Sequence, residues 1–209
     1  MEADTPDAFE IVVICSGNRF RSPLVAACLR EATAGLPVRV GSAGTLDLGA
    51  LPAMEGAVAA ARELELDLDD HVSRFVGRVP LHDADLVLGF ERMHVTTAVV
   101  DGNAKRERTF TLPELVALLE EYEPPEASDP IERARLAIAQ ADRARGRNST
   151  LQPPEIADPI GTSAKAQRRT AFKLTDLAGR LVTELFGRPV ERAERASRRP
   201  WRERLRGRG

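Results

Sequence analysis

The chain has 209 residues, which is enough for one domain with a sizeable hydrophobic core. Its 30 Lys and Arg residues and 32 Asp and Glu residues give a net charge of −2, so the charge of the whole chain does not indicate a polyanionic partner. The chain has only two cysteines, which argues against a disulfide scaffold. It has no run of about 18 apolar residues, so we expect no transmembrane segment.

The first predicted elements are a strand, a turn and a helix. Residues 9–14 are apolar and rich in β-branched side chains, which predicts a buried parallel strand. The pattern from residue 23 to about 34 predicts a helix, with Ser22 as its N-cap and Pro23 as its first residue. Residues 15–23 (CSGNRFRSP) therefore span the turn that leads from the strand to the helix N-terminus.

This turn has the residue types that bind an anion. Loop N–H groups that point inward and the positive end of the helix both attract negative charge. Gly17 and Asn18 tolerate the left-handed backbone that such a loop needs, and Arg21 can hold two oxygens of a phosphate. We expect Cys15 to be a thiolate in this setting, and hence a nucleophile toward phosphorus.

The rest of the chain alternates between the two kinds of element. Expected strands lie at residues 37–40, 84–90 and 107–111, and expected helices at 52–66, 91–100, 112–121 and 164–186. Strands that alternate with helices favour a parallel sheet. The sequence therefore predicts an α/β fold: a single doubly wound domain over residues 9–187, with a four-stranded parallel sheet flanked by helices.

Two segments depart from this pattern. Residues 123–155 begin and end with proline pairs and include an Ala- and Arg-rich helix at 131–145, which we interpret as a solvated or loosely docked helix in a surface insertion. Residues 187–209 contain nine Arg and three Glu. We expect 188–209 to be a disordered basic tail that could contact an anionic partner such as nucleic acid or lipid.

The motif at Cys15 resembles the phosphate loop of low molecular weight protein tyrosine phosphatases. The resemblance rests on Cys-x-Gly-Asn-x-x-Arg-Ser-Pro directly after a hydrophobic strand. It implies a phosphocysteine intermediate on Cys15, phosphoryl binding by Arg21, and no metal or other cofactor. The loop residues implied in substrate binding are Ser16, Gly17, Asn18, Arg19, Phe20 and Ser22. Ser22 would also hydrogen-bond the thiolate.

Two further sequence elements resemble segments that support the phosphate loop in this family. Residues 42–45 read Ser-Ala-Gly-Thr, and the resemblance implies that Ser42 braces the loop through Asn18. His71 stands in a His-x-Ser-Arg element whose His joins the same hydrogen-bond network in the family. His82 and His94 have no such context, so we interpret them as structural or surface residues. Three scattered His residues predict no metal site.

The leaving group also needs a proton, and the family supplies it from an Asp-Pro loop before the last helix. Asp158-Pro159 precedes the predicted helix 164–186, whereas Asp129-Pro130 precedes the helix of the insertion. We therefore predict Asp158 as the general acid and base. Ile160 replaces an aromatic residue that many members carry, and Phe20 replaces a second loop cysteine that can trap an oxidised nucleophile.

The predicted function is that of a cysteine-dependent phosphomonoester hydrolase, most simply a protein-tyrosine-phosphatase acting on phosphotyrosine in proteins. Three alternatives stay open: a thiol-dependent arsenate reductase on the same fold, a catalytically weak phosphate-binding regulatory protein, and a nucleic-acid or membrane adaptor that works through the basic tail. The acidic N-terminus lacks an apolar core, so we expect no signal peptide. A catalytic thiol must also stay reduced, so we expect the protein to be located in the cytoplasm.

Overall fold

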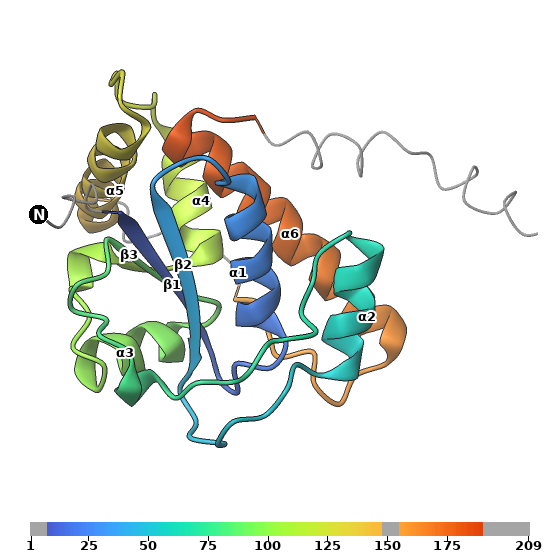
Figure 1. The fold of residues 1–209 in the computed structure, drawn as a ribbon. Coiled ribbons are helices and arrows are strands. Elements are labelled where there is room, and N and C mark those ends of the chain that lie inside the picture. The colour runs from blue at the N-terminus through green and yellow to red at the C-terminus, as the bar shows by residue number, and fades with distance from the viewer. Residues whose placement is uncertain (1–7, 148–154, 190–209) are drawn as a thin grey trace, which may run out of the picture.

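The computed structural model of the chain describes residues 8–147 and 155–189 (Figure 1). The strands are β1 (Phe9–Cys15), β2 (Val38–Gly44), β3 (Leu86–Gly89) and β4 (Thr109–Thr111). The helices are α1 (Arg21–Ala32), α2 (Glu55–Glu63), α3 (Arg92–Val100), α4 (Leu112–Glu121), α5 (Pro130–Arg147) and α6 (Ala164–Phe186). Two short 3-10 helices, η1 (Val76–Arg78) and η2 (Arg106–Arg108), complete the order.

The four strands form one parallel sheet in the order β2-β1-β3-β4, which confirms the predicted fold class. The strand β1 is central, and its last residue, Cys15, lies opposite Gly44 at the end of β2. On its other side Ile11 lies opposite Leu86 of β3. The order changes direction beside β1, and the carboxyl ends at such a point are where α/β folds bind ligands.

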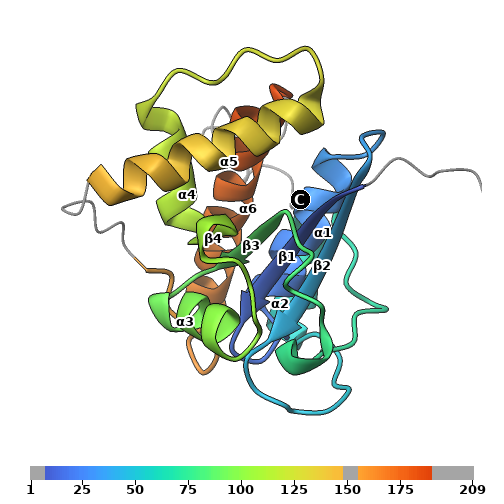
Figure 2. The same ribbon diagram turned by 90° about the vertical axis from the view of Figure 1, so that its left-hand side faces the viewer.

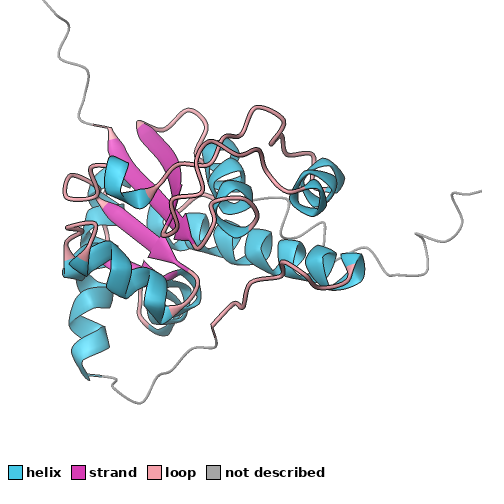
Figure 3. Ribbon diagram, turned by 90° about the horizontal axis from the view of Figure 1, so that it is seen from below, coloured by secondary structure: helices cyan, strands magenta, loops and turns pink. Residues whose placement is uncertain are grey.

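Helices cover both faces of the sheet because side chains alternate along each strand. Ile11 and Val13 pack into the core with α1, α2, α4, α5 and α6, whereas Val12 and Ile14 pack on the other face with Ala98 of α3. Figure 2 shows α3 apart from α1 and α6, and Figure 3 shows the strands in magenta between the helices. This is a doubly wound arrangement.

The start of α1 differs from the prediction. The helix begins at Arg21 and its N-cap is Phe20, not Ser22. The Ser22 hydroxyl does not cap the helix because it is turned back toward the loop, where it lies 3.0 Å from the Cys15 thiol. The residue that looked like a structural cap is therefore part of the site.

The interpretation of the helix in residues 123–155 as solvated or loosely docked is wrong. The helix α5 buries one face in the main core, formed by Ile131, Ala134, Ala137, Ile138, Ala141 and Ala144. Near its end the Arg145 guanidinium stacks 3.6 Å above the centre of the Phe110 ring and donates to Thr109 O at 3.0 Å. A face of alanines packs closely but gives a weak hydrophobic signal in the sequence.

The predicted boundaries 9–187 stay a prediction. The basic segment 188–209 lies outside the described residues, apart from 188 and 189. Of the helices that the structure describes, none combines the length and the apolar character needed to cross a bilayer.

Candidate active site

The loop between β1 and α1 lies at the carboxyl edge of the sheet, at the lower end of the molecule in Figure 1. Its first residue, Cys15, has only 2% of its surface exposed. The thiol sulfur lies 3.0 Å from Ser22 Oγ and accepts the N–H of Asn18 at 3.2 Å. These two contacts fix the position of the sulfur at the end of β1.

Asn18 holds the loop in shape. It is fully buried and has φ of +53°, the left-handed backbone expected for this position. Its amide nitrogen donates to Ser22 Oγ and to Ser42 Oγ, each at 2.9 Å, and its amide oxygen accepts the backbone N–H of Arg74 at 2.9 Å. Its carbonyl accepts Nε2–H of His71 at 2.6 Å. Ser42 and His71 thus both contact Asn18, and their supporting roles in the site stay predictions.

His71 is half-buried, and burial lowers the pKa of its ring; the hydrogen bond with Asn18 opposes this, and the cations Arg30 and Arg74 add to it. The lowered pKa favours the neutral ring, and because the Asn18 carbonyl can only accept, Nε2 carries the hydrogen. His71 has a structural part in this network, with no charge to add.

Glycine at the end of β2 lets the loop approach the sheet. A Cβ at Gly44 would lie 2.8 Å from Ser16 O and 3.0 Å from Asn18 N, both backbone atoms. In the loop itself, a Cβ at Gly17 would lie 3.2 Å from the side chain of Leu48. Gly17 thus keeps a close approach to Leu48, while Asn18 adopts the left-handed backbone.

Arg21 is completely buried and makes four polar contacts. Nη1 donates to Glu91 Oε1 at 2.8 Å and to Ile156 O at 2.9 Å, and Nη2 donates to Ser16 Oγ at 3.1 Å and to Asp158 Oδ2 at 2.7 Å. Within the described part of the chain, its buried Nε has no hydrogen-bond partner. A buried donor left without a partner at the start of α1 is suited to an incoming anion.

Asp158 is the Asp-Pro residue that the fold brings to the loop. Its Oδ1 accepts Ile160 N–H at 3.1 Å, and the preceding segment is anchored where Ile156 N donates to Phe90 O at 3.0 Å. The other candidate, Asp129, caps α5: its two oxygens accept the N–H groups of Ile131 and Glu132 at 3.3 and 3.2 Å. The arrangement favours Asp158 as the partner of the loop.

Sequence reasoning missed Glu91 and His94. His94 is fully buried in the first turn of α3, its Nε2 lies 3.1 Å from Ser16 Oγ, and its Nδ1 accepts the N–H groups of Phe90 and Glu91 at 3.3 and 3.2 Å. Burial, aided by Arg21, lowers the pKa of His94 to about 4. No local pattern could have found it, because 78 residues separate it from Ser16.

The rim of the loop is aliphatic and basic. Leu46, Leu48 and Ile160 are 54%, 43% and 44% exposed. Arg19 is half-buried and its Nε donates to Pro52 O at 3.0 Å. Phe20, in contrast, is 1% exposed and belongs to the core rather than to an open surface. A substrate entering here meets alkyl groups and a second cation.

The second cysteine lies in a different environment. Cys28 is in α1 and points at α6, with its sulfur 4.0 Å from Thr175 O. This fits the expectation of a small core residue.

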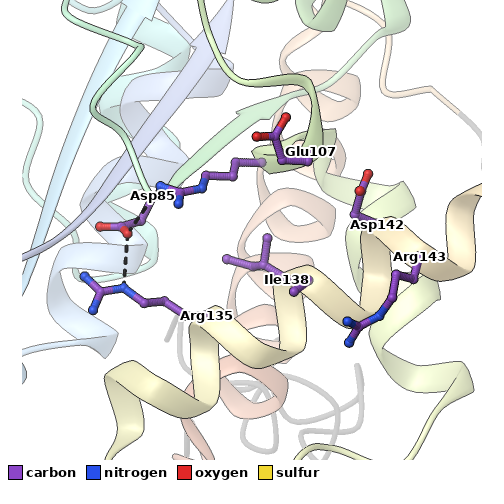
Figure 4. A pocket seen from close by; sticks show the side chains of 8 residues that line it. Asp85, Glu107, Arg135, Ile138, Asp142 and Arg143 are labelled. Atoms are coloured by element: carbon purple, nitrogen blue, oxygen red, sulfur yellow. Dashed lines mark hydrogen bonds and ion pairs between the residues drawn. The ribbon is translucent and has the colours of Figure 1, made fainter.

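A hollow of about 380 Å³ lies elsewhere, between η2 and α5 (Figure 4). Its wall includes Asp85, Arg135 and Ile138, and Asp85 Oδ1 accepts Nε–H of Arg135 at 3.2 Å. None of its lining residues is a cysteine, serine or histidine. Across residues 8–147 and 155–189, no group of three or more His, Cys, Asp and Glu residues is placed to hold a metal ion.

Comparison with known proteins agrees with this geometry. The family model "Low molecular weight phosphotyrosine protein phosphatase" matches residues 10–137. The protein-arginine-phosphatase of Bacillus subtilis (strain 168) is 33% identical over 109 residues, which cover 51% of this chain and 72% of the relative. The probable low molecular weight protein-tyrosine-phosphatase EpsP of Ralstonia solanacearum is 32% identical over 134 residues, 63% of this chain and 84% of the relative.

A solved structure extends the likeness to the whole fold. The YwlE arginine phosphatase, in a mutant whose active-site serine is phosphorylated, superposes with a TM-score of 0.61 at 26% identity. The superposition covers 85% of this chain and 95% of the other. The family model spans the phosphate loop, the Ser42 segment and His71, and so includes the elements that build the site apart from the Asp158 segment. The chain therefore belongs to the low molecular weight phosphotyrosine protein phosphatase family.

Proposed function

We propose that this chain is a protein phosphatase that uses Cys15 as nucleophile, Arg21 as phosphoryl-binding cation and Asp158 as general acid and base. The observation that carries the proposal is the position of Arg21. Its guanidinium is buried beside the loop, touches Asp158, and keeps Nε open. One anion bound there would lie between a thiol and a carboxyl group.

In the first step the Cys15 sulfur attacks phosphorus and the bond from phosphorus to the substrate oxygen breaks. The loop N–H groups and Arg21 stabilise the phosphoryl oxygens as charge develops on them. Asp158 gives its proton to the leaving oxygen, and Ser22, 3.0 Å from the sulfur, stabilises the thiolate before attack. The product is a phosphocysteine, analogous to the phosphoserine in the mutant relative.

In the second step water attacks the phosphocysteine. Asp158, now a carboxylate, takes a proton from the water, the sulfur–phosphorus bond breaks, and inorganic phosphate leaves. Nothing in the step requires a group other than those already named.

The ion pair between Arg21 and Asp158 supports this assignment. In the free site the guanidinium stabilises the carboxylate of Asp158 at 2.7 Å. A phosphoryl group bound to Arg21 would therefore lie next to the carboxyl group that the proposal makes the proton donor.

Phosphotyrosine in proteins is the substrate that we propose first, in line with the name of the family and of the EpsP relative. Phosphoarginine is the second candidate, since the Bacillus relative is named a protein-arginine-phosphatase and the rim lacks an exposed aromatic side chain among the described residues. Peptides carrying either group, matched in sequence, would separate the two by kcat/KM.

The test of the proposal is hydrolysis of p-nitrophenyl phosphate with reductant present. The wild type should turn over, Cys15→Ser should abolish turnover, and Asp158→Ala should reduce it strongly. Turnover that persists in Cys15→Ser would refute the mechanism. An inactive wild type that still binds vanadate would favour a phosphate-binding protein.

The proposal places the enzyme in the cytoplasm, where a catalytic thiol stays reduced. Its partner is a phosphorylated protein. An anionic partner of the basic segment 188–209 is a separate proposal, supported by the charge of that segment alone.

A further inference from the structure

The hydrogen-bond network behind the loop determines where the hydrogen atoms of Ser16 and His94 lie. His94 Nδ1 faces two backbone donors, Phe90 N–H and Glu91 N–H, so it must be the unprotonated nitrogen. The single hydrogen of the neutral ring is therefore on Nε2, which points at Ser16 Oγ at 3.1 Å. The low pKa of His94, about 4, agrees with a neutral ring at neutral pH.

Ser16 Oγ receives a second donor from the other side. Arg21 Nη2 lies 3.1 Å from the same oxygen. A hydroxyl oxygen has two lone pairs, and these two donors fill both of them. The hydroxyl hydrogen of Ser16 must then point away from His94 and Arg21, and Ser16 can act only as a donor.

We infer that His94 is a positioning residue that turns the Ser16 hydroxyl into an obligate donor toward a phosphoryl oxygen bound above Cys15. The inference rests on the proposed function, because it assigns a task within the same site. Ser16 is adjacent to the proposed nucleophile in the chain and only half-buried, so it lies in the loop that the proposed ligand would occupy. His94 itself stays fully buried and acts through Ser16.

The backbone is built to allow this approach. A Cβ at Gly89, the last residue of β3, would lie 2.8 Å from Cβ of His94. Glycine at this position therefore lets α3 bring the ring against the sheet and toward the loop. Glu91, which precedes α3, pairs with Arg21 Nη1 at 2.8 Å and lies 3.7 Å from His94 Nε2. The turn between β3 and α3 thus positions both donors to Ser16: it carries His94, and its Glu91 pairs with Arg21.

Two substitutions test separately the acceptor Nδ1 and the donor Nε2 of the His94 ring. In His94→Asn the amide oxygen can replace Nδ1 as acceptor for the backbone N–H groups, but no donor reaches Ser16. In His94→Gln the longer amide can still place a donor near Ser16 Oγ. The matched control is His82→Asn, the same change at an exposed position.

The experiment is a double-mutant cycle of His94→Asn with Ser16→Ala, read in kcat/KM for p-nitrophenyl phosphate and in the Kd for vanadate. When Ser16 is present, we expect His94→Asn to lower kcat/KM roughly 10-fold and to raise the Kd for vanadate by a similar factor, as for the loss of a hydrogen bond to a charged group. We expect little further loss when residue 16 is alanine, substantial recovery in His94→Gln, and no change in His82→Asn.

Equal losses in the Ser16 and Ser16→Ala backgrounds would overturn the inference, because His94 would then act by a route that does not include the hydroxyl. No loss in His94→Asn would overturn it too. If the wild type binds vanadate without hydrolysing the ester, the proposed function fails while the vanadate cycle still decides the inference. If it binds no vanadate, both fail.

Discussion

Arg21 Nη2 and Asp158 Oδ2 lie 2.7 Å apart, although 137 residues separate them in the chain. The arginine is fully buried, whereas the carboxylate side chain is 32% exposed. The contact joins the phosphate loop to the segment before α6. It also brings the proposed acid to the cation that would bind the phosphoryl group.

Replacing Asp158 with Asn tests this relationship. The amide can still accept from Arg21 but cannot give a proton to the leaving group, so kcat should fall by about 10²–10⁴ with alkyl or unsubstituted phenyl phosphates. With p-nitrophenyl phosphate, whose leaving group needs less protonation, a smaller but still clear loss should remain, because the proposed Asp158 also takes a proton from water in the second step. Steady-state kinetics over a series of leaving groups gives the measurement.

The control for this change is Asp129→Asn, which alters the other Asp-Pro pair. Asp129 caps α5, so its replacement should leave kcat unchanged and affect only stability, by about 1 kcal/mol or less. Equal kinetic losses at both positions would count against Asp158 as the acid.

Gly44→Ala should damage the loop from behind. The added methyl group would lie 2.8 Å from Ser16 O, and neither backbone segment can yield easily. We expect a loss of about 1–3 kcal/mol in the free energy of unfolding and weaker vanadate binding. Gly41→Ala in the same strand, where the methyl group would lie 3.4 Å from the end of the Arg74 side chain, is the comparison. Matching results in calorimetry for the two variants would contradict the prediction.

Ile138→Ala tests the packing of α5. Ile138 is 4% exposed, so its truncation should cost about 2–4 kcal/mol in urea unfolding. Leu136→Ala, two residues away and 41% exposed, should cost well under half as much. If both changes cost little, α5 is not held to the core as the structure has it.

Acid should destabilise the protein through His94. The unfolded chain binds a proton on this ring near pH 6.5, whereas the folded pKa is about 4, so the unfolded state holds more protons between these values. Stability must therefore fall as the pH falls from 6.5 to 4, by up to about 3 kcal/mol from this group. His71, with its lowered pKa, acts in the same direction.

Urea unfolding at pH 4.5 and pH 7, in the wild type and in His94→Asn, measures the contribution of His94 to the pH dependence of stability. The difference in unfolding free energy between the two pH values should be smaller in the variant, while other groups cancel. His82→Asn should keep the wild-type difference. An unchanged difference in His94→Asn would show that the ring does not resist protonation in the fold.

Local patterns in the sequence predicted the fold well. The strand at residues 9–14, the helix at 112–121 and the helix at 164–186 each carry apolar residues at a spacing that the structure confirms. The helix α5 shows the same spacing, but in alanines among arginines, and alanine gives little hydrophobic signal even where it packs tightly. Its docking therefore could not be read from composition.

The site was predictable where a residue stands in the phosphate motif itself, and less so elsewhere. Cys15, Asn18 and Arg21 stand close together in the chain, whereas His94 reaches Ser16 from 78 residues away. Ser22 looked like a helix cap because serine before proline commonly has that role, and only the tertiary contact with Cys15 reveals its other use. Contacts of this kind depend on how the elements pack.

The distance along the chain between the two halves of the site also bears on how the protein is made. Cys15 and Arg21 leave the ribosome long before Ile156 and Asp158, which complete the surroundings of the guanidinium. At about 5–20 residues per second, translating the 137 residues from Arg21 to Asp158 takes on the order of ten seconds. During that interval a nascent chain carries the proposed nucleophile without the proposed acid, so we expect full activity only when the segment before α6 has been synthesised.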